Sequence, residues 1–214
     1  EFRRVLFRSY MVTLELKDST GKVIEAEAEH VGFREIYKVN INDAEQEQMQ
    51  ITGQKIIFRG VNRHDASLEN GSAVTNQEII DDLKLMKQYN VNAVRTSHYP
   101  NAKILYDLAD ELGIYVYAEA NVESHYGAYG DHKVPIPGGD SRWVTPVLDR
   151  NMNMLELLKN HASIIGWSYG NEATYTRCPL DNTYCFWAAA MAVLNRDPSR
   201  LRMYERESDG YYHR

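Results

Sequence analysis

The sequence predicts an α/β fold, the front part of an eight-stranded (β/α)8 barrel preceded by the end of a β-sandwich. From Tyr10 to about residue 50, apolar and polar residues alternate around a turn at Ser19-Thr20-Gly21, a pattern typical of half-buried antiparallel strands. After the turn at Thr52-Gly53, short apolar strands alternate with helices, which implies a parallel sheet. We therefore expect residues 10–50 to belong to the sandwich and residues 51–214 to the barrel.

The predicted barrel strands are short, and a helix is expected between each pair. The strands are predicted at residues 56–61, 93–96, 114–118 and 164–169, with a weaker one at 201–204. The first helix begins at a capping box formed by Thr75 and Glu78. The second begins after Pro100-Asn101 and ends at Gly113, a residue type favoured just beyond a helix. Two further helices are expected at about residues 147–160 and 186–194.

A polar cluster follows each of the first four predicted barrel strands. The clusters are at residues 62–65, 97–99, 119–125 and 171–172. Functional groups at the carboxyl ends of several strands are typical of the (β/α)8 barrel. The first strand is not followed by a glycine-rich phosphate-binding turn, which disfavours an open nucleotide-binding sheet. The sequence therefore predicts a site at the carboxyl ends of the strands.

Composition and charge exclude several classes of partner. The formal net charge of −6 argues against nucleic acid, because phosphate binding needs a concentrated basic face. No apolar run approaches the ~20 residues of a membrane span. The two cysteines, Cys178 and Cys185, do not match a structural zinc site and are interpreted as free thiols. This favours the cytoplasm, although the sequence leaves the compartment open.

The first nine residues differ in character from the rest of the chain. Residues 1–9, EFRRVLFRS, fit neither a signal peptide nor the strand that follows. We expect them to be a cloning or sequencing-adapter remnant, which vector sequence in the underlying DNA would verify.

Glu172 has the strongest chemical interpretation of any residue in the chain. The buried-strand pattern of residues 164–169 would carry Asn171 and Glu172 to the mouth of the barrel. Partial desolvation, and a second carboxylate ~5 Å away, would favour the protonated form that a general acid needs. Cleavage of a glycosidic bond with retention requires such an acid and a second carboxylate at the anomeric carbon. Asn171 could donate a hydrogen bond to a sugar hydroxyl beside that carbon.

Several sequence blocks resemble the β-galactosidases of glycoside hydrolase family 2. They are FRGVNRHD at 58–65, LKLMKQYNVNAVRTSHYPN at 83–101, GIYVYAEANVESHYG at 113–127, DSRW at 140–143 and IIGWSYGNE at 164–172. The resemblance extends from about Val31 to the region of Pro198, in the family's order. It implies a TIM-barrel catalytic domain preceded by the tail of an immunoglobulin-like β-sandwich. It also implies a retaining enzyme that hydrolyses terminal non-reducing β-D-galactose residues in β-galactosides.

The resemblance implies roles for individual side chains. Glu172 would be the proton donor and then the base. His98 and Asn171 match residues that contact the sugar or stabilise the transition state. His64 is left between a substrate contact and a structural role, and Arg95 is expected to position the carboxylates.

The resemblance also implies a metal site. Glu123, His125 and Glu172 match the family's magnesium ligands. Glu123 and His125 are two residues apart, so their side chains would point to one side of an extended segment. Magnesium usually prefers all-oxygen ligands, which leaves manganese as the alternative occupant.

The chain departs from the family pattern at two points. Asp65-Ala66-Ser67 follows His64 where galactosidases often have a second histidine, which leaves substrate preference open. The family's nucleophilic glutamate belongs at the end of the seventh strand, which at ~30 residues per βα unit falls beyond Arg214. We therefore expect the 214-residue chain alone to be inactive and marginally stable.

Three alternatives remain open from the sequence. A β-glucuronidase or β-mannosidase of the same family is the nearest, although the block EANVESH at 119–125 resembles galactosidases more closely. A non-catalytic sugar-binding protein and a metal-dependent barrel hydrolase are the others. The whole protein is also expected to form a homo-oligomer.

Overall fold

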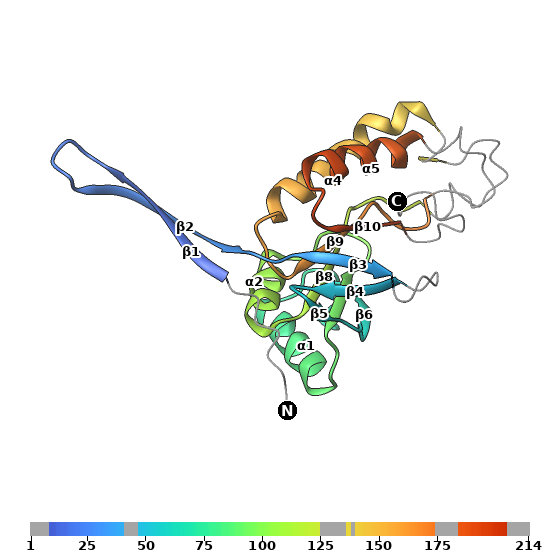
Figure 1. Cartoon of the computed structure of the whole chain (residues 1–214), viewed down its shortest axis with the longest axis horizontal. Helices are drawn as coiled ribbons and strands as arrows, with labels where there is room; N and C mark the ends of the chain where they lie inside the picture. The colour runs from blue at the N-terminus through green and yellow to red at the C-terminus, as the bar shows by residue number, and fades with distance from the viewer. Residues whose placement is uncertain (1–8, 41–46, 125–135, 138–139, 174–183, 205–214) are drawn as a thin grey trace.

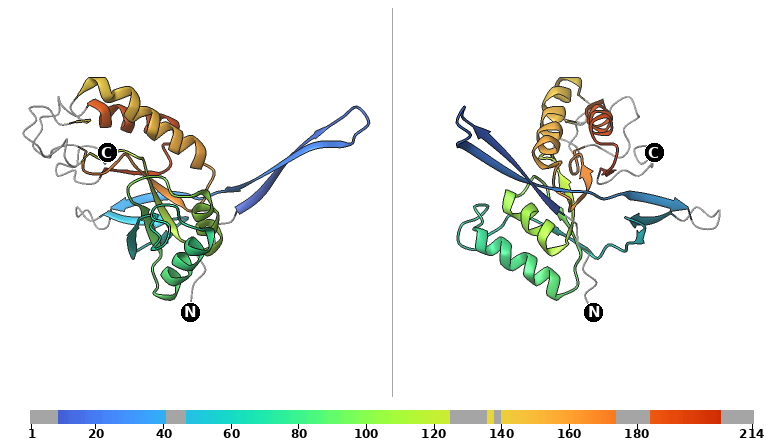
Figure 2. Two further views of the ribbon diagram at one scale, coloured as in Figure 1. Left: turned by 180° about the vertical axis from the view of Figure 1, so that it is seen from behind. Right: turned by 60° about the vertical axis from the view of Figure 1, so that its left-hand side comes forward.

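A parallel sheet with helices along its outer side makes up the body of the molecule, and a long β-hairpin projects from it (Figures 1 and 2). The computed structural model describes residues 9–40, 47–124, 136–137, 140–173 and 184–204. Most of the stretch interpreted as an adapter remnant lies outside these residues. Ser9, its last residue, begins the hairpin opposite Gly32. The origin of residues 1–9 as an adapter remnant stays a prediction.

Five parallel strands form the sheet, in the spatial order β10-β9-β8-β7-β6. The strands are β6 (Gly60–Arg63), β7 (Ala93–Thr96), β8 (Tyr115–Glu119), β9 (Ile164–Ser168) and β10 (Leu201–Met203). Each strand therefore pairs with the next one along the chain, as in a (β/α)8 barrel. Their carboxyl ends lie at the same edge, where the sequence predicts the site.

The first barrel strand begins later than the sequence predicts. Ile56 to Arg59 lie outside any strand, whereas β6 starts at Gly60. The apolar character of this stretch has another cause, because the Phe58 ring packs edge-on against the ring of Tyr115, with centroids 5.6 Å apart. Ile56 and Phe58 thus contribute to packing rather than to the parallel sheet, whereas Ile57 is exposed.

The helices lie along the outside of the sheet, α1 beside α2 and α4 beside α5 (Figure 1). They are α1 (Asn76–Gln88), α2 (Lys103–Leu112), α4 (Val144–Leu158) and α5 (Tyr184–Arg196), and the 3-10 turn η1 (Ser141–Trp143) precedes α4. The capping box is confirmed, since the Thr75 hydroxyl accepts from the Glu78 N–H and the Glu78 carboxylate accepts from the Thr75 N–H. Gly113 ends α2 in the left-handed conformation that glycine adopts without strain.

The main core lies between the sheet and these helices. Each helix buries an apolar stripe, represented by the fully buried Ile79 of α1, Leu105 of α2, Leu155 of α4 and Val193 of α5. Removing this apolar surface from water is the main driving force for folding. Within the described residues, no helix is both long enough and apolar enough to span a lipid bilayer.

The residues before the barrel form two small antiparallel sheets. The hairpin pairs β1 (Ser9–Lys17) with β2 (Val23–Gly32), and the second sheet holds β3 (Ile36–Asn40), β4 (Glu47–Ile51) and β5 (Gln54–Lys55). The sandwich tail itself stays a prediction.

The hairpin strands are exposed rather than half-buried, contrary to the sequence expectation. Met11 is 66% exposed, Leu14 69% and Ile24 63%. The hairpin projects away from the sheet and packs mainly against itself, which leaves both of its faces in solvent (Figure 2).

A buried charge network lies at the amino ends of β9 and β10. The Trp167 indole donates to Asp197 (2.9 Å), and the Arg200 guanidinium forms an ion pair with the same carboxylate. Arg200 also donates to the backbone carbonyl of Ile164 (2.8 Å). Trp167 is therefore a core residue rather than a surface on which a sugar could stack.

A second buried pair, formed by a histidine and an aspartate, lies just before the start of β9. His161 Nδ1 is 2.8 Å from Asp110 Oδ2, and the Ser163 N–H donates to Asp110 Oδ1 (2.6 Å).

Cys185 is a separate buried group, whose thiol donates to the Pro137 carbonyl. Burial raises the pKa of Cys185 to about 11, so this thiol is protonated at neutral pH. Cys178 lies outside the described residues.

Candidate active site

The candidate site begins with Glu119, the last residue of β8, which lies among polar groups from β7 and β9. Its side chain is fully buried. Oε2 accepts from Arg95 Nε (2.6 Å) and from the Ser168 hydroxyl (2.6 Å), while Oε1 lies 2.5 Å from His98 Nδ1. Burial of a carboxylate is costly unless it is paired and hydrogen-bonded, and these contacts meet that condition.

Arg95 connects this carboxylate to the segment that carries Glu172. Its Nε donates to Glu119, and its Nη2 donates to Asn171 Oδ1 (2.8 Å). A planar guanidinium held at two positions has a fixed orientation. Arg95 therefore joins the ends of β7 and β8 to the residues that follow β9.

Asn171 is buried, and both ends of its amide have partners. Its Oδ1 accepts from Arg95, and its Nδ2 donates to Glu123 Oε1 (2.9 Å). Its backbone N–H donates to the Val122 carbonyl (2.9 Å), so the segment after β9 runs beside the segment after β8. Glu123 thus lies against the residue that immediately precedes Glu172.

Glu172 is half-buried, and the backbone is fixed on either side of it. Asn171 is held by Val122, and the Ala173 N–H donates to the Tyr204 hydroxyl (2.8 Å). Glu172 itself has φ of 41°, a left-handed conformation that is uncommon for residues other than glycine. Such conformations cluster at functional sites, where the surrounding structure enforces them. The outlier is therefore an observation in favour of a functional role for this residue.

His64 and His98 lie side by side at the same edge. Their rings meet edge to face with centroids 5.1 Å apart, and the Tyr99 ring is 6.0 Å from His64. His64 is exposed, whereas His98 is half-buried. The structure thus brings His64 into the group formed by His98, Arg95, Asn171 and Glu172.

Arg63, next to His64, has structural contacts. It forms ion pairs with Asp65 (2.5 Å) and Asp82 (3.0 Å) and donates to Asn101 Oδ1 (2.9 Å). These contacts tie the loop after β6 to α1 and to the loop after β7. The geometry therefore favours a structural role for Arg63.

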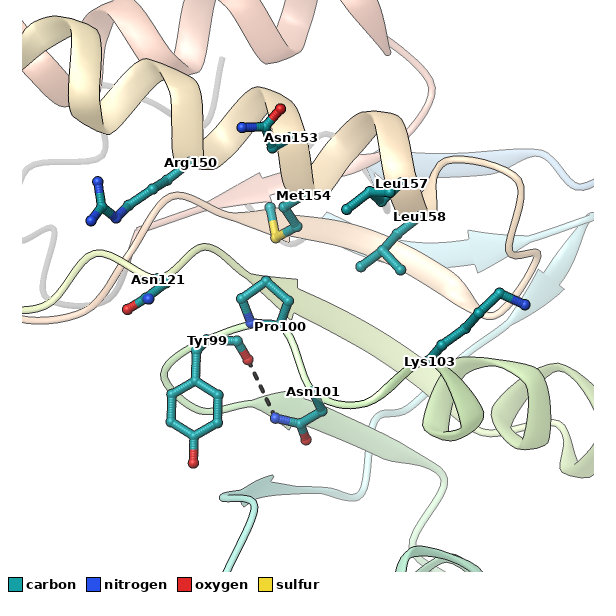
Figure 3. Close-up of a pocket in the computed structure, with 10 residues that line it drawn as sticks. All are labelled: Tyr99, Pro100, Asn101, Lys103, Asn121, Arg150, Asn153, Met154, Leu157 and Leu158. Carbon is teal, nitrogen blue, oxygen red and sulfur yellow. Dashed lines mark hydrogen bonds between the residues drawn. The ribbon is translucent and has the colours of Figure 1, made fainter. Parts of the chain in front are cut away.

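Two cavities open near these groups. The larger, of about 670 Å³, lies between α4 and the loop after β7, where Met154 and Leu158 face Pro100 (Figure 3). The smaller, of about 220 Å³, is lined by Glu123 and Trp143 among other residues. Trp143, the last residue of the block at 140–143, therefore lines a cavity that reaches Glu123.

The predicted metal ligands are described only in part. Glu123 and Glu172 come from neighbouring segments and supply the carboxylate oxygens that magnesium favours. His125 lies outside the described residues. In the part of the chain that the structure describes, no three potential metal-ligating side chains gather in one place. The donor type of the two described residues fits a magnesium ion.

The residue that sequence reasoning missed is Glu119. In the sequence it is one member of the polar cluster at residues 119–125, and the pattern predicts no role for it. The available signal is an acidic residue placed directly at the end of a buried strand pattern, YVYAE at residues 115–119. Ser168, which donates to it, was hidden within the apolar pattern of β9.

Comparison with known proteins identifies relatives of this chain. The TIM barrel domain of the glycosyl hydrolases family 2 matches residues 39–213. The β-galactosidase of Pseudoalteromonas haloplanktis is 44% identical over 196 residues, which cover 92% of this chain and 17% of that protein. The β-galactosidase of Priestia megaterium is 41% identical over 201 residues, which cover 92% of this chain and 18% of that protein. The chain thus spans less than a fifth of the length of these relatives.

Solved structures share the fold. A β-glucuronidase from Ruminococcus gnavus in complex with D-glucuronic acid superposes with a TM-score of 0.75 at 24% identity, covering 96% of this chain and 33% of that one. β-Glucuronidase 3 of Bacteroides uniformis gives a TM-score of 0.72 at 24% identity, covering 92% and 23%. At this identity the likeness concerns the fold alone, and it confirms the predicted partial (β/α)8 barrel. Because the domain match spans most of the sequence, this chain belongs to glycosyl hydrolase family 2.

Proposed function

We propose that this chain supplies the acid/base side of a retaining β-galactosidase, which hydrolyses terminal non-reducing β-D-galactose residues in β-galactosides. The observation that carries the proposal is the placement of Glu172. It lies at the carboxyl edge of a parallel sheet, with its backbone fixed on both sides and its neighbour Asn171 bonded to Arg95 and Glu123. The curated relatives named above are β-galactosidases.

In the proposed reaction Glu172 acts twice. Its carboxylic acid first protonates the oxygen of the leaving group, while a second carboxylate attacks the anomeric carbon. The resulting carboxylate of Glu172 then takes a proton from the water that hydrolyses the glycosyl-enzyme intermediate. The nucleophile is proposed to come from a part of the barrel that the five described strands do not include.

The neighbouring polar groups are proposed to bind and orient the sugar. Asn171, His98 and His64 carry amide and imidazole groups suited to hydroxyls, and they meet at one edge of the sheet. Arg95 is proposed to hold Asn171 in place rather than to contact the sugar itself. The sugar would thus be bound beside the acid that protonates its leaving group.

A magnesium ion is proposed to be held by Glu123, His125 and Glu172, with manganese as the alternative. When bound, the ion supplies positive charge beside the acid/base carboxylate. The chain's own contribution is to hold Glu123 through the Asn171 amide, which places a carboxylate against the residue that precedes Glu172.

The test of the acid/base role uses a chimera. This chain replaces the matching segment of the β-galactosidase from Pseudoalteromonas haloplanktis, which supplies the rest of the barrel. Glu172→Gln should lower kcat by about 10²–10⁴-fold, because a positioned general acid contributes that much. Glu111→Gln, at an exposed position on α2, is the matched control and should leave kcat unchanged. Full activity in the Glu172→Gln chimera would refute the assignment.

Substrate class is tested with the same chimera. Nitrophenyl β-galactoside should be hydrolysed in preference to nitrophenyl β-glucuronide and nitrophenyl β-mannoside. A preference for the glucuronide or mannoside would replace the galactosidase proposal by the corresponding relative. Binding of galactosides with no turnover of any of the three would favour a sugar-binding protein. The homo-oligomeric state stays a prediction, which sedimentation of the complete enzyme would measure.

A further inference from the structure

Glu119 is a buried carboxylate to which the proposed reaction assigns no step. It is fully buried, and it accepts from groups on two neighbouring strands and the loop after β7. Its own backbone N–H donates to the Thr96 hydroxyl (3.0 Å), which fixes the end of β8 against β7. A charge buried so completely is kept only where its partners are well placed. The partners of this carboxylate include two side chains of the candidate site, Arg95 and His98.

We propose that Glu119 is a positioning residue that sets the orientation of Arg95 and the proton position on His98, a proposal that rests on the function proposed above. Each of the two carboxylate oxygens binds one of these side chains. Oε2 takes the Arg95 Nε–H, and Oε1 takes the proton on His98 Nδ1. Glu119 has no solvent-exposed surface, so it acts on a bound sugar only through these side chains.

The contact with Arg95 controls the direction of the rest of that side chain. Once Nε is held at 2.6 Å by Glu119, the planar guanidinium can rotate little, and its Nη2 points to Asn171 Oδ1 at 2.8 Å. The Asn171 amide is thereby oriented with Nδ2 toward Glu123. The carboxylate of Glu119 thus determines, through one guanidinium, how the residue before Glu172 is turned.

The contact with His98 selects one form of the imidazole. An ionised carboxylate only accepts, so the 2.5 Å contact places a proton on His98 Nδ1. The hydrogen bond on one ring nitrogen decides the role of the other, which leaves Nε2 for a ligand. Without Glu119, the ring would keep its contacts with the His64 ring and, at 3.4 Å, with Arg95 Nη2, but no carboxylate would hold the proton on Nδ1.

The first test is a kinetic cycle in the chimera described above. Glu119→Gln keeps the volume of the side chain but turns an NH₂ group toward one of the donors. We expect kcat/KM to fall about 10–100-fold, the usual effect of changing a residue that orients a ligand-binding group. With Arg95→Met as the second change, the two losses should not multiply, because Glu119 acts largely through Arg95. Glu119→Asp should restore part of the loss.

The second measurement is independent of activity. Nitrogen-15 NMR of the 214-residue chain, labelled at its histidines, reports which ring nitrogen of His98 carries the proton. In the native chain we expect the proton on Nδ1. Glu119→Gln and Glu119→Ala should shift the His98 signals, while those of His161, paired with Asp110 elsewhere, should stay unchanged. A purely structural role for Glu119 would instead lower the thermal midpoint and leave the turnover of folded enzyme intact.

The outcomes separate this proposal from the proposed function. If the native chimera hydrolyses no galactoside, the function fails, and the NMR result alone decides whether Glu119 sets His98. The positioning proposal is overturned if Glu119→Gln keeps kcat/KM within about 3-fold of the native chimera, since an orienting residue should cost more. It is equally overturned if the losses multiply fully or if the His98 signals do not move.

Discussion

Asp197 shows at the scale of one residue how a buried charge stabilises this fold. It is 7% exposed and accepts from Trp167 and Ser199 in addition to its ion pair with Arg200. Arg200 in turn donates to Ile164 O, at the amino end of β9. The carboxylate therefore joins the start of β10 to the strand beside it.

Replacement of Asp197 should destabilise the chain strongly. Asp197→Asn leaves the buried Arg200 without its counter-charge, which costs about 3 kcal/mol when one partner of a buried pair is removed. Urea unfolding at neutral pH measures the change. Asp149→Asn, at an exposed position on α4, is the matched control and should shift stability little. Equal stability of the two variants would contradict this reading of the pair.

The same carboxylate predicts a pH dependence. Burial opposes ionisation, but the Arg200 charge and the hydrogen bonds from Ser199, Arg200 and Trp167 outweigh it and hold the pKa of Asp197 at about 2. The ordinary pKa of an aspartate side chain is 3.8, so the folded chain binds this proton less tightly than the unfolded chain. The stabilisation is complete above about pH 4 and is lost as pH falls toward 2, amounting to about 2 kcal/mol.

The measurement compares the native chain with Asp197→Asn. Their difference in unfolding free energy should shrink from pH 5 to pH 2, while the difference between the native chain and Asp149→Asn stays level. A constant gap for Asp197→Asn would contradict the assigned pKa.

Some residues of the candidate site could be predicted from the sequence, and others could not. The placement of Glu172 at the carboxyl edge of the sheet could be predicted, because the residue comes shortly after a strong strand pattern. Glu119 could not be assigned a role, because its partners Arg95 and Ser168 lie 24 and 49 residues away in the chain. Only the folded sheet shows that these groups meet, and only it shows the left-handed backbone at Glu172.

At the scale of elements, the contact between β8 and β9 depends on a glycine. A methyl group added at Gly166 would lie 2.3 Å from Cε1 of Tyr117 on the neighbouring strand. Gly166→Ala should therefore cost about 2 kcal/mol, the usual penalty for overpacking a core. The double variant with Tyr117→Ala should lose less than the sum of the two single variants in urea unfolding, since the clash is removed. Additive losses would show that the ring does not meet the new methyl group.

Elements with strong local signals were predicted well. Strand β7 and the capping box of α1 agree with the prediction at every residue. Both are recognised from residues that are close together in the sequence, a short apolar run in one case and a Thr–Glu pair three residues apart in the other. The first barrel strand was misplaced, because Ile56 and Phe58 are apolar residues that pack against the core cluster around Tyr115 without joining the sheet. The hairpin was predicted as strands correctly, but its burial was wrong, because alternation alone does not supply a partner sheet.

At the scale of the whole molecule, the described sheet is a part of a barrel and has two edges. It ends at β6 and β10 in the described residues, whereas a closed (β/α)8 barrel has eight strands and no edge. Exposed edges carry unpaired backbone groups and favour association between chains. The open sheet is consistent with the expectation of marginal stability for the chain alone.

The 214-residue chain by itself should hydrolyse no β-galactoside. The proposed acid, Glu172, is present, but retaining chemistry also needs a nucleophile from a part of the barrel beyond the five described strands. The check is nitrophenol release by purified chain, compared with its Glu172→Gln variant. Turnover that the substitution abolishes would overturn the prediction, whereas equal traces in both preparations would indicate a contaminating enzyme.

The polar groups at the two ends of the sheet form separate networks, one around Glu119 and the other around Asp197. Distant sites with no shared partners combine their energetic effects nearly independently. An engineer could therefore strengthen the amino-terminal network to gain heat tolerance and separately remodel the proposed sugar site around the carboxyl-terminal one, with little compromise between the two aims.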